Sequence, residues 1–308
     1  MDLTVLAERL RAKGLTVIQI GDAEVSGISS DSRTVKHGEL FAALPGLTVD
    51  GNKFDWAALA QGASAILTSK KSEQFPAQLI VSDVHKALGI ASGIILNSRV
   101  DEQFSVGVTG TNGKTSICFL VAQAISYLDG KAVYGGTLGL KVLKLGKESE
   151  DGIDTNTTTP ETVEFHRYLG AHPDSKGFAV EISSMALDQK RLCGLELDVV
   201  VFSNLTRDHL DYHKTLKNYF EAKKNLFLRD LKDSKKKQRV AILNVKHENL
   251  RQFAEELKNE GFKLCGYSTD HKTESDYPLT KHINYSLSLS GAEFELEYSG
   301  KDITLTRT

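Results

Sequence analysis

The sequence contains few cysteines, and none stands in a pattern that builds a site. Its 308 residues include only three, Cys118, Cys193 and Cys265, which are widely spaced and form no Cys-x-x-Cys pair. An odd number of isolated cysteines predicts neither a disulfide framework nor a zinc knuckle. We therefore expect a protein of the reducing cytoplasm.

The sequence also lacks an excess of either charge and long apolar runs. Lysine and arginine total 38 and aspartate and glutamate 40, so no concentrated basic surface for nucleic acid is expected. The lysines at 235–237 are the one basic run, which we interpret as a solvated loop. No stretch approaches the roughly 20 apolar residues of a membrane helix, and residues 1–10 lack the pattern of a signal peptide. We expect neither a nucleic-acid nor a membrane partner.

What is present indicates two α/β domains. The chain is too long for one ordinary core, and its content of 40% hydrophobic and 25% charged residues is typical of a globular protein. Residues 1–102 alternate short apolar runs with helical patterns, which predicts a small α/β domain that ends in a linker at 97–103. Residues 103–308 would form the second domain.

The second domain has alternating strand and helix patterns. The predicted strands are 104–109, 178–182, 199–202 and 239–243, and the predicted helices are 114–128, 216–227 and 248–260. Nearly continuous apolar strands between helices predict a mostly parallel, doubly wound sheet. The period-two alternation near the end predicts antiparallel strands at 285–289, 293–298 and 303–306.

The strongest local signal is a glycine-rich turn between a predicted strand and a predicted helix. Residues 110–115 read GTNGKT, followed by Ser116. Glycines allow the backbone to approach phosphate oxygens, and free N–H groups at a helix start favour an anion. Lys114 would contact the β- and γ-phosphates of a nucleotide, and the Thr115 hydroxyl would bind Mg²⁺. Val108 departs from the common phosphate-loop pattern, which has glycine there, and a glycine turn with an incidental lysine is the alternative.

Two further features carry candidate metal ligands. Glu181 ends an apolar strand, and ligands of an open parallel sheet gather at the carboxyl ends of its strands. His209 and His213 have a spacing that zinc ligands use, but no third strong ligand accompanies them. Mg²⁺ prefers oxygen ligands, so the residue types alone do not assign His209 to magnesium. A solvated carboxylate at a strand end is the alternative for Glu181.

Five segments together resemble the Mur ligases, and most closely their UDP-N-acetylmuramoyl-tripeptide synthetase branch. They are residues 29–46, SSDSRTVKHGELFAALPG; 110–115, GTNGKT; 181–191, EISSMALDQKR; 204–213, NLTRDHLDYH; and 219–227, YFEAKKNLF. Folylpolyglutamate synthases share the GTNGKT form but lack the front segment. The resemblance covers nearly the whole chain.

The resemblance implies a set of catalytic and nucleotide-binding residues. Glu181 and His209 would contact magnesium, and Lys223 would be carbamylated and so hold a second magnesium ion. Without the flanking match, Lys223 would be one more surface lysine. The residues expected to bind ATP form the loop itself: Gly110, Thr111, Asn112, Gly113, Lys114, Thr115 and Ser116.

The resemblance also implies a substrate site. In the front domain, Ser29, Ser30 and the turn at 47–51 would bind the UDP part of the substrate, although residues 31–33 could simply form a turn with a surface ion pair. Residues 156–160 would face a sugar phosphate or carboxylate or cap a helix. In that segment Thr158 and Thr159 are the expected substrate contacts, and Ser184, Gln189 and Arg191 would face the muramoyl peptide. Met185 stands where the family usually has histidine, which leaves the contacts there open.

The expected activity is that of an ATP-dependent amide ligase of peptidoglycan precursor synthesis. It would add meso-diaminopimelate or L-lysine to UDP-MurNAc-L-Ala-D-Glu through an acyl phosphate. The family continues with a third domain that binds the incoming amino acid, so we expect this chain to be a monomeric fragment, inactive alone. The alternatives are a non-catalytic UDP-sugar or nucleotide-binding module and an unrelated P-loop ATPase.

Overall fold

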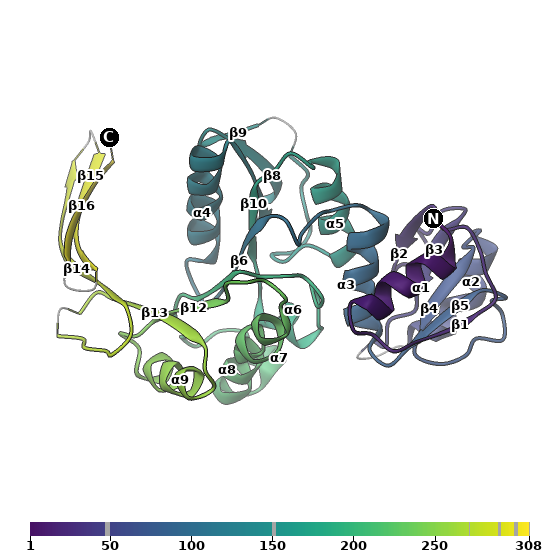
Figure 1. The fold of residues 1–308 in the computed structure, drawn as a ribbon. Coiled ribbons are helices and arrows are strands. Elements are labelled where there is room, and N and C mark those ends of the chain that lie inside the picture. The colour runs from purple at the N-terminus through teal and green to yellow at the C-terminus, as the bar shows by residue number, and fades with distance from the viewer. Residues whose placement is uncertain (47–49, 150–151, 271, 289–290, 299–300, 308) are drawn as a thin grey trace.

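The computed structural model describes two β-sheets, one on each side of residues 102–103 (Figure 1). It describes residues 1–46, 50–149, 152–270, 272–288, 291–298 and 301–307, with the backbone alone over 282–296 and 301–307. The expected α/β fold is confirmed. None of the helices in these ranges has the length and apolar character that a membrane crossing requires.

The front part is a small sheet with the strand order β1-β5-β4-β3-β2. Its strands are β1 Val17–Ile20, β2 Gly27–Ser29, β3 Glu39–Ala42, β4 Ala65–Thr68 and β5 Gln78–Val81, all parallel except β1. Its helices are α1 Leu3–Ala12, the 3₁₀ helix η1 Gly51–Phe54, α2 Asp55–Ala60 and α3 Val84–Ile95. Leu3, Leu6 and Leu10 of α1 are completely buried because their spacing places them on one helix face.

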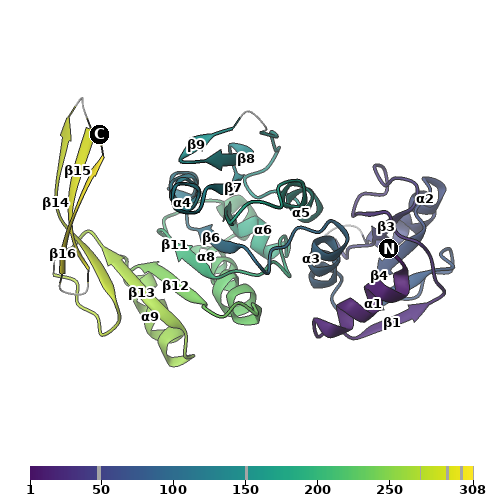
Figure 2. The ribbon, with the colours of Figure 1, turned by 45° about the horizontal axis from the view of Figure 1, so that its top comes forward.

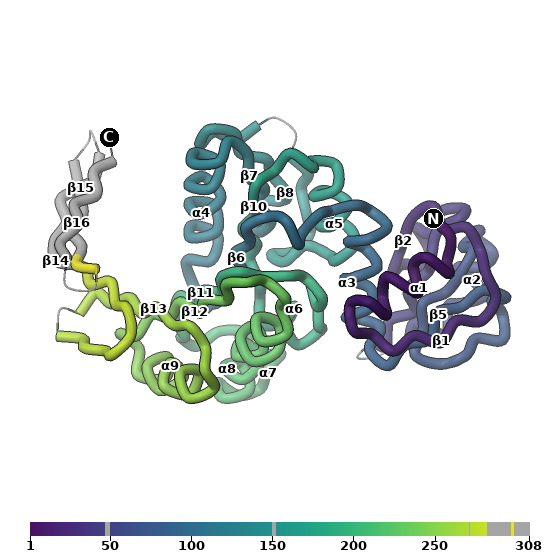
Figure 3. The backbone as a smooth tube through the Cα atoms, viewed as in Figure 1, coloured from purple at the N-terminus to yellow at the C-terminus, as the bar shows by residue number. Residues whose placement is uncertain are grey.

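The large sheet has the order β16-β15-β14-β13-β12-β11-β6-β10-β7-β8-β9. The parallel strands are β6 Phe104–Thr109, β7 Lys131–Gly136, β10 Gly177–Glu181, β11 Val199–Phe202, β12 Val240–Asn244, β13 Lys263–Ser268 and β14 Leu279–Ser288. Antiparallel strands extend both edges: β8 Gly139–Lys144, β9 Lys147–Glu148, β15 Gly291–Tyr298 and β16 Lys301–Arg307. Helix α9 Glu248–Asn259 packs against β12 and β13 (Figure 3).

Helices lie on both faces of the central strands (Figures 1 and 2). They are α4 Lys114–Asp129, α5 Thr162–Ala171, α6 Ser184–Asp188, α7 Leu210–His213, α8 Leu216–Asn225, the π-helix Leu226–Leu231 and α9 Glu248–Asn259. The predicted strands 104–109 and 199–202 match β6 and β11, and the predicted helix at 114–128 is α4. The hairpin β7–β8 and strand β13 were not predicted, and residue 289 of the predicted strand 285–289 lies outside the described residues.

The expectation of a solvated lysine loop at 235–237 is wrong for Lys236. Its side chain is only 8% exposed and its amine lies 3.3 Å from a carboxylate oxygen of Asp198. The Asp198 carboxylate also accepts hydrogen bonds from the backbone N–H and hydroxyl of Ser105. The ion pair therefore ties the loop to the start of β6 and of β11. The sequence did not predict this pair because Lys236 and Asp198 are far apart in the chain.

Helix α3 joins the two sheets by packing against α5 (Figure 2). Val163 of α5 belongs to the same apolar cluster as Ala87 and Ala91 of α3. Gly89 is where α3 comes closest, since a Cβ there would lie 1.9 Å from the carbonyl oxygen of Cys193. Glycine thus allows a close backbone contact between α3 and the large sheet's domain.

Candidate active site

The predicted phosphate loop, residues 110–115, connects β6 to α4 at the carboxyl end of the parallel strands. Gly110 has φ 143° and Gly113 has φ 80°, conformations that favour glycine. A Cβ on Gly110 would lie 2.0 Å from the Ser203 hydroxyl. Gly113 precedes α4 without a side-chain cap, so the N–H groups of the first turn remain available to an anion.

Lys114 lies across this loop. Its amine donates to the carbonyl oxygens of Gly110 (3.0 Å) and Thr111 (2.8 Å). Burial lowers the pKa of Lys114, while the nearby carboxylates of Glu181 and Asp208 act to raise it. The lysine is therefore held at the loop with two acidic groups close by.

Asn112 and Ser116 of the predicted nucleotide set are exposed. The backbone N–H of Asn112 donates to the side-chain oxygen of Asn204 at 2.9 Å. Thr111 is buried, and its hydroxyl accepts from the N–H of Thr206 at 2.9 Å. The loop after β11 thus holds the phosphate loop from one side.

Glu181 ends β10 directly beside the phosphate loop, with no exposed surface. Its carboxylate accepts hydrogen bonds from the Thr115 hydroxyl (3.0 Å), the Thr137 N–H (2.9 Å) and the Tyr134 hydroxyl (2.5 Å). Burial, and then the hydrogen bond to Glu181, raise the pKa of Tyr134 far above its ordinary value. The structure therefore brings Glu181 and Thr115 together, as predicted.

Tyr134 and Thr137 are site residues that the sequence did not reveal. Both lie at the end of β7, in the hairpin that was not predicted, and Glu181 is more than forty residues away in sequence. β10 pairs with β7 on one side and β6 on the other. Only this strand order brings Tyr134 to the acid, and no local motif signals it.

His209 is not joined to Glu181 in a ligand cluster within the described residues. Its ring is 6.2 Å from that of Tyr219, and its Nε2 lies 3.6 Å from Asp208. Within the part of the chain that the structure describes, no group of three His, Cys, Asp or Glu side chains could hold a metal ion. His213, by contrast, is buried and shares a 2.9 Å hydrogen bond with Ser184.

Lys223 is buried, with 1% of its surface exposed. Its amine donates to the Gly110 carbonyl at 2.8 Å and lies 4.5 Å from the centre of the Tyr219 ring. Burial, and then the charge of Lys114, lower the pKa of Lys223 well below its ordinary value. The adjacent Lys224 instead pairs with Glu256 at 2.7 Å, so the surface-lysine alternative does not describe Lys223.

A cavity of about 650 Å³ lies between the front part of the chain and the part that contains the large sheet. The front part contributes Leu44, Pro45, Gly46, Ser69, Ser82, Asp83, Val84 and His85, and the large part contributes Glu161, Asp188, Gln189, Lys190 and Arg191. Two predicted substrate residues, Gln189 and Arg191, therefore line it. Arg191 pairs there with Glu161 at 3.1 Å.

The predicted substrate residues Thr158, Thr159 and Ser184 do not line this cavity. Thr159 is buried, and its hydroxyl accepts from the N–H of Ser183 at 2.9 Å. Thr158 is half-buried. Ser184 is buried at the start of α6. Of the three, Thr159 contacts the cavity wall, since its carbonyl accepts from Arg191 at 3.3 Å.

Neither Ser29 nor Ser30, the front-domain residues expected to bind the UDP part of the substrate, lines this cavity. Ser29 is buried at the end of β2 and its hydroxyl donates to the Asp31 carbonyl, while Ser30 is half-buried. Arg33 pairs with Asp31 at 2.7 Å, which favours the turn with a surface ion pair. Residues 47–49 of the predicted turn lie outside the described residues.

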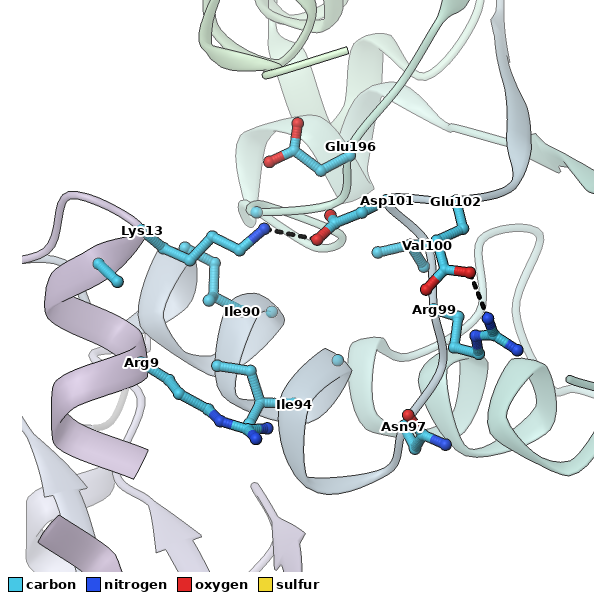
Figure 4. A pocket seen from close by; sticks show the side chains of 14 residues that line it. Arg9, Lys13, Ile90, Ile94, Asn97, Arg99, Val100, Asp101, Glu102 and Glu196 are labelled. Carbon is cyan, nitrogen blue, oxygen red and sulfur yellow. Dashed lines mark hydrogen bonds and ion pairs between the residues drawn. The ribbon is translucent and has the colours of Figure 1, made fainter. Parts of the chain in front are cut away.

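A second cavity, of about 370 Å³, lies on the linker side of the same interface (Figure 4). Its walls come from α1, α3, residues 97–102, Gly194 and Glu196, and Lys13, directly after α1, pairs with Asp101 at 2.5 Å across it. The described residues that line it include none of the predicted site residues. We therefore assign the site to the first cavity and the phosphate loop.

Comparison with known proteins gives this arrangement a family. Residues 108–306 match the model of the Mur ligase middle domain, and residues 24–92 match that of the Mur ligase family, catalytic domain. A UDP-N-acetylmuramoyl-L-alanyl-D-glutamate--2,6-diaminopimelate ligase of Bacteroides fragilis is 37% identical over 91% of the chain and 56% of its own length. The corresponding L-lysine ligase of Staphylococcus haemolyticus is 33% identical over 96% of the chain and 58% of its own length.

A solved structure is similar as well. That of a UDP-N-acetylmuramoyl-L-alanyl-D-glutamate--2,6-diaminopimelate ligase superposes with a TM-score of 0.71 at 30% identity. It matches 91% of this chain and 55% of its own. The chain thus spans a little more than half the length of these relatives. Because the middle-domain match extends over more than half of the sequence and includes the phosphate loop, Glu181 and Lys223, the chain belongs to the Mur ligase family.

Proposed function

We propose that this chain is the UDP-substrate-binding and ATP-binding part of a ligase that adds the third residue of the peptidoglycan peptide. The reaction would join meso-diaminopimelate or L-lysine to UDP-MurNAc-L-Ala-D-Glu. The observation that carries the proposal is the convergence of Lys114, Glu181 and Lys223 on one loop. The domains would be residues 1–102 and 103–308.

The phosphate loop supports ATP as the nucleotide. The tight turn at Gly110 and the free N–H groups at the start of α4 fit a polyphosphate chain. The Lys114 amine would exchange its carbonyl partners for phosphate oxygens, which are stronger acceptors because they are charged. Glycine or lysine alone would not indicate a phosphate site. Their position at the strand-to-helix turn is what supports one.

The donor set next to the loop also fits Mg²⁺. Glu181 and Thr115 supply a buried carboxylate and a hydroxyl, both hard oxygen ligands. The family resemblance makes His209 the candidate for a third ligand, and it would have to approach Glu181, with which it forms no ligand cluster in the described residues. In the reaction Mg²⁺ would neutralise charge on the transferring phosphoryl oxygens.

A carbamate on Lys223 fits its surroundings. Carbamylation joins the neutral amine to CO₂ with loss of a proton, and the lowered pKa of Lys223 favours that neutral amine. The modified side chain would be an anion beside Lys114, which removes a repulsion between two cations and offers oxygen to a metal. Burial of Lys223 beside the loop would place such a carbamate next to the bound nucleotide.

The interdomain cavity supports a UDP-muramoyl dipeptide as substrate. Arg191 could release Glu161 and form a bidentate pair with a substrate carboxylate. Lys114 and the first turn of α4 would then hold the γ-phosphoryl group while a substrate carboxylate attacks its phosphorus. The bond to the β-phosphate oxygen would break, ADP would leave, and an acyl phosphate would form. An amino-acid amine would attack the acyl carbon, lose a proton and displace inorganic phosphate. The protein acts mainly by position and electrostatics.

Isothermal titration of the unaltered chain tests the proposal. We expect both Mg²⁺·ATP and UDP-MurNAc-L-Ala-D-Glu to bind at independent, saturable sites. Binding of ATP without any affinity for the UDP ligand would instead favour a P-loop ATPase unrelated to amide ligation. Binding of the UDP ligand without ATP would favour a non-catalytic UDP-sugar module. A chain that binds neither ligand would refute the proposal.

A further inference from the structure

Two side chains on strands distant from the phosphate loop converge on one backbone carbonyl. Asn244 ends β12 and Tyr267 lies directly opposite it on β13. The Asn244 amide and the Tyr267 hydroxyl donate to the Ser203 carbonyl at 2.9 and 3.0 Å. Burial raises the pKa of Tyr267 to about 12, so its hydroxyl keeps its proton at neutral pH and can donate.

Ser203 is in turn attached to the phosphate loop. Its hydroxyl donates to the Asn112 carbonyl at 2.7 Å, and its N–H donates to the Thr109 carbonyl at 2.9 Å. The next residue, Asn204, exchanges side-chain hydrogen bonds with the N–H and carbonyl of Asn112, both at 2.9 Å. The Asn204 carbonyl also accepts from the Thr111 N–H at 3.0 Å. Residues 203 and 204 thus set the backbone of residues 109–112.

From these contacts we propose that Asn244 and Tyr267 are positioning residues for the nucleotide, acting through Ser203 on the phosphate loop. Neither side chain needs to touch ATP. Their hydrogen bonds fix the segment that holds Thr111 and Asn112 in the geometry that a polyphosphate requires. The inference rests on the proposed nucleotide site and adds two residues to it.

The shared acceptor gives this arrangement a distinctive energetic signature. A hydrogen bond contributes only modestly to net stability, whereas a buried acceptor left with no partner costs more. Ser203 is only 2% exposed. Loss of one donor leaves the other in place, so each single substitution should have a small effect. Loss of both should have an effect larger than the sum, as coupled groups show.

The experiment is a double-mutant cycle with Asn244→Ala and Tyr267→Phe, measured by titration of Mg²⁺·ATP and of UDP-MurNAc-L-Ala-D-Glu. We expect each single variant to weaken ATP binding about threefold and the double variant roughly thirtyfold or more. Affinity for the UDP ligand should stay within about twofold in all of them. Exposed Tyr127→Phe and Asn249→Ala serve as matched controls and should bind both ligands normally.

Other outcomes separate the inference from the proposed function. Unchanged ATP affinity in the double variant, additive effects, or an equal loss of both ligands would overturn the positioning role. Failure of the unaltered chain to bind ATP would refute the nucleotide site itself. If Asn244→Ala does not fold, Asn244→Asp provides a second test, because it replaces the donor with an acceptor at the same position. That variant should weaken ATP binding more than Tyr267→Phe does, and an equal or smaller effect counts against the inference.

Discussion

The amines of Lys114 and Lys223 donate hydrogen bonds to the same oxygen, the Gly110 carbonyl, at 3.0 and 2.8 Å. Two ammonium groups so close together in a buried site repel each other. The consequence is a lowered pKa for Lys223, with burial as the larger cause and the charge of Lys114 as the second. The pair therefore favours any chemistry that removes the positive charge of Lys223.

Carbamylation of Lys223 is the first testable outcome. A chain incubated with ¹³C-labelled bicarbonate should show a carbamate resonance by NMR, because the buried amine is neutral at a lower pH than an exposed lysine. Lys223→Arg should lose the resonance, and Lys217→Arg, at an exposed position of the same helix, should keep it. A resonance that survives in Lys223→Arg would show that the modification lies elsewhere.

The same lysine should leave a signature in stability against pH. Since the pKa of Lys223 is lower in the folded chain than in the unfolded one, the unfolded state binds more protons between these two values. The free energy of unfolding should therefore rise as pH increases through this window. Urea denaturation from neutral pH to about pH 10, in bicarbonate-free buffer, should show this rise.

Lys223→Met should flatten the rise, because it removes the titrating group. Lys217→Met, which replaces an exposed lysine, should keep it. An unchanged slope in Lys223→Met would mean that the buried amine does not titrate differently in the two states.

Glu181→Gln tests the metal side of the site. The substitution preserves the shape of the side chain but removes its negative charge, so Mg²⁺ should no longer strengthen ATP binding and the affinity should fall about tenfold or more. The free energy of unfolding should fall by roughly 1–3 kcal/mol, since four donors lose a charged acceptor. Titrations with and without Mg²⁺ measure the effect. Exposed Glu8→Gln is the control, and a full Mg²⁺ response in Glu181→Gln would exclude Glu181 as a ligand.

Local patterns predicted the elements that carry the nucleotide site. β6 and α4 were predicted because an apolar strand, a glycine turn and an amphipathic helix follow one another within 26 residues. Glu181 and Lys223 were predicted from segments that resemble the family. A strand, a glycine turn and a helix depend mainly on residues that are close together in sequence. The structure therefore has β6, the turn and α4 with nearly the predicted bounds.

Features that depend on contacts distant in sequence were missed. Tyr134 contacts Glu181 because β7 pairs with β10. The Lys236 side chain is buried against Asp198, which directly precedes β11. The same reason hid the convergence of Asn244 and Tyr267 on Ser203. Strand order decides these contacts, and composition and periodicity do not specify strand order.

The interface between the two parts can be tested with two glycines of α3. Gly89→Ala should destabilise the chain by about 3 kcal/mol or more, because its Cβ would lie 1.9 Å from the Cys193 carbonyl. Affinity for the UDP ligand should fall, while ATP binding at the distant loop should persist. Calorimetry and titration measure both effects.

Gly93→Ala, one turn later in the same helix, is the matched control. The nearest atom to its Cβ would be the Ser98 hydroxyl at an ordinary 3.5 Å. Alanine is favoured over glycine in a helix, so stability should rise or stay within about 1 kcal/mol. Equal effects of the two substitutions would mean that the close contact at Gly89 does not hold the interface.

The most direct test of the account is the titration of Lys114→Ala with Mg²⁺·ATP and, separately, with UDP-MurNAc-L-Ala-D-Glu. We expect ATP affinity to fall about a hundredfold or more, because a charged hydrogen-bond donor to the phosphates is lost, while the UDP ligand binds as in the unaltered chain. Lys217→Ala should bind both normally. ATP affinity that is unchanged in Lys114→Ala would contradict the placement of the nucleotide on this loop.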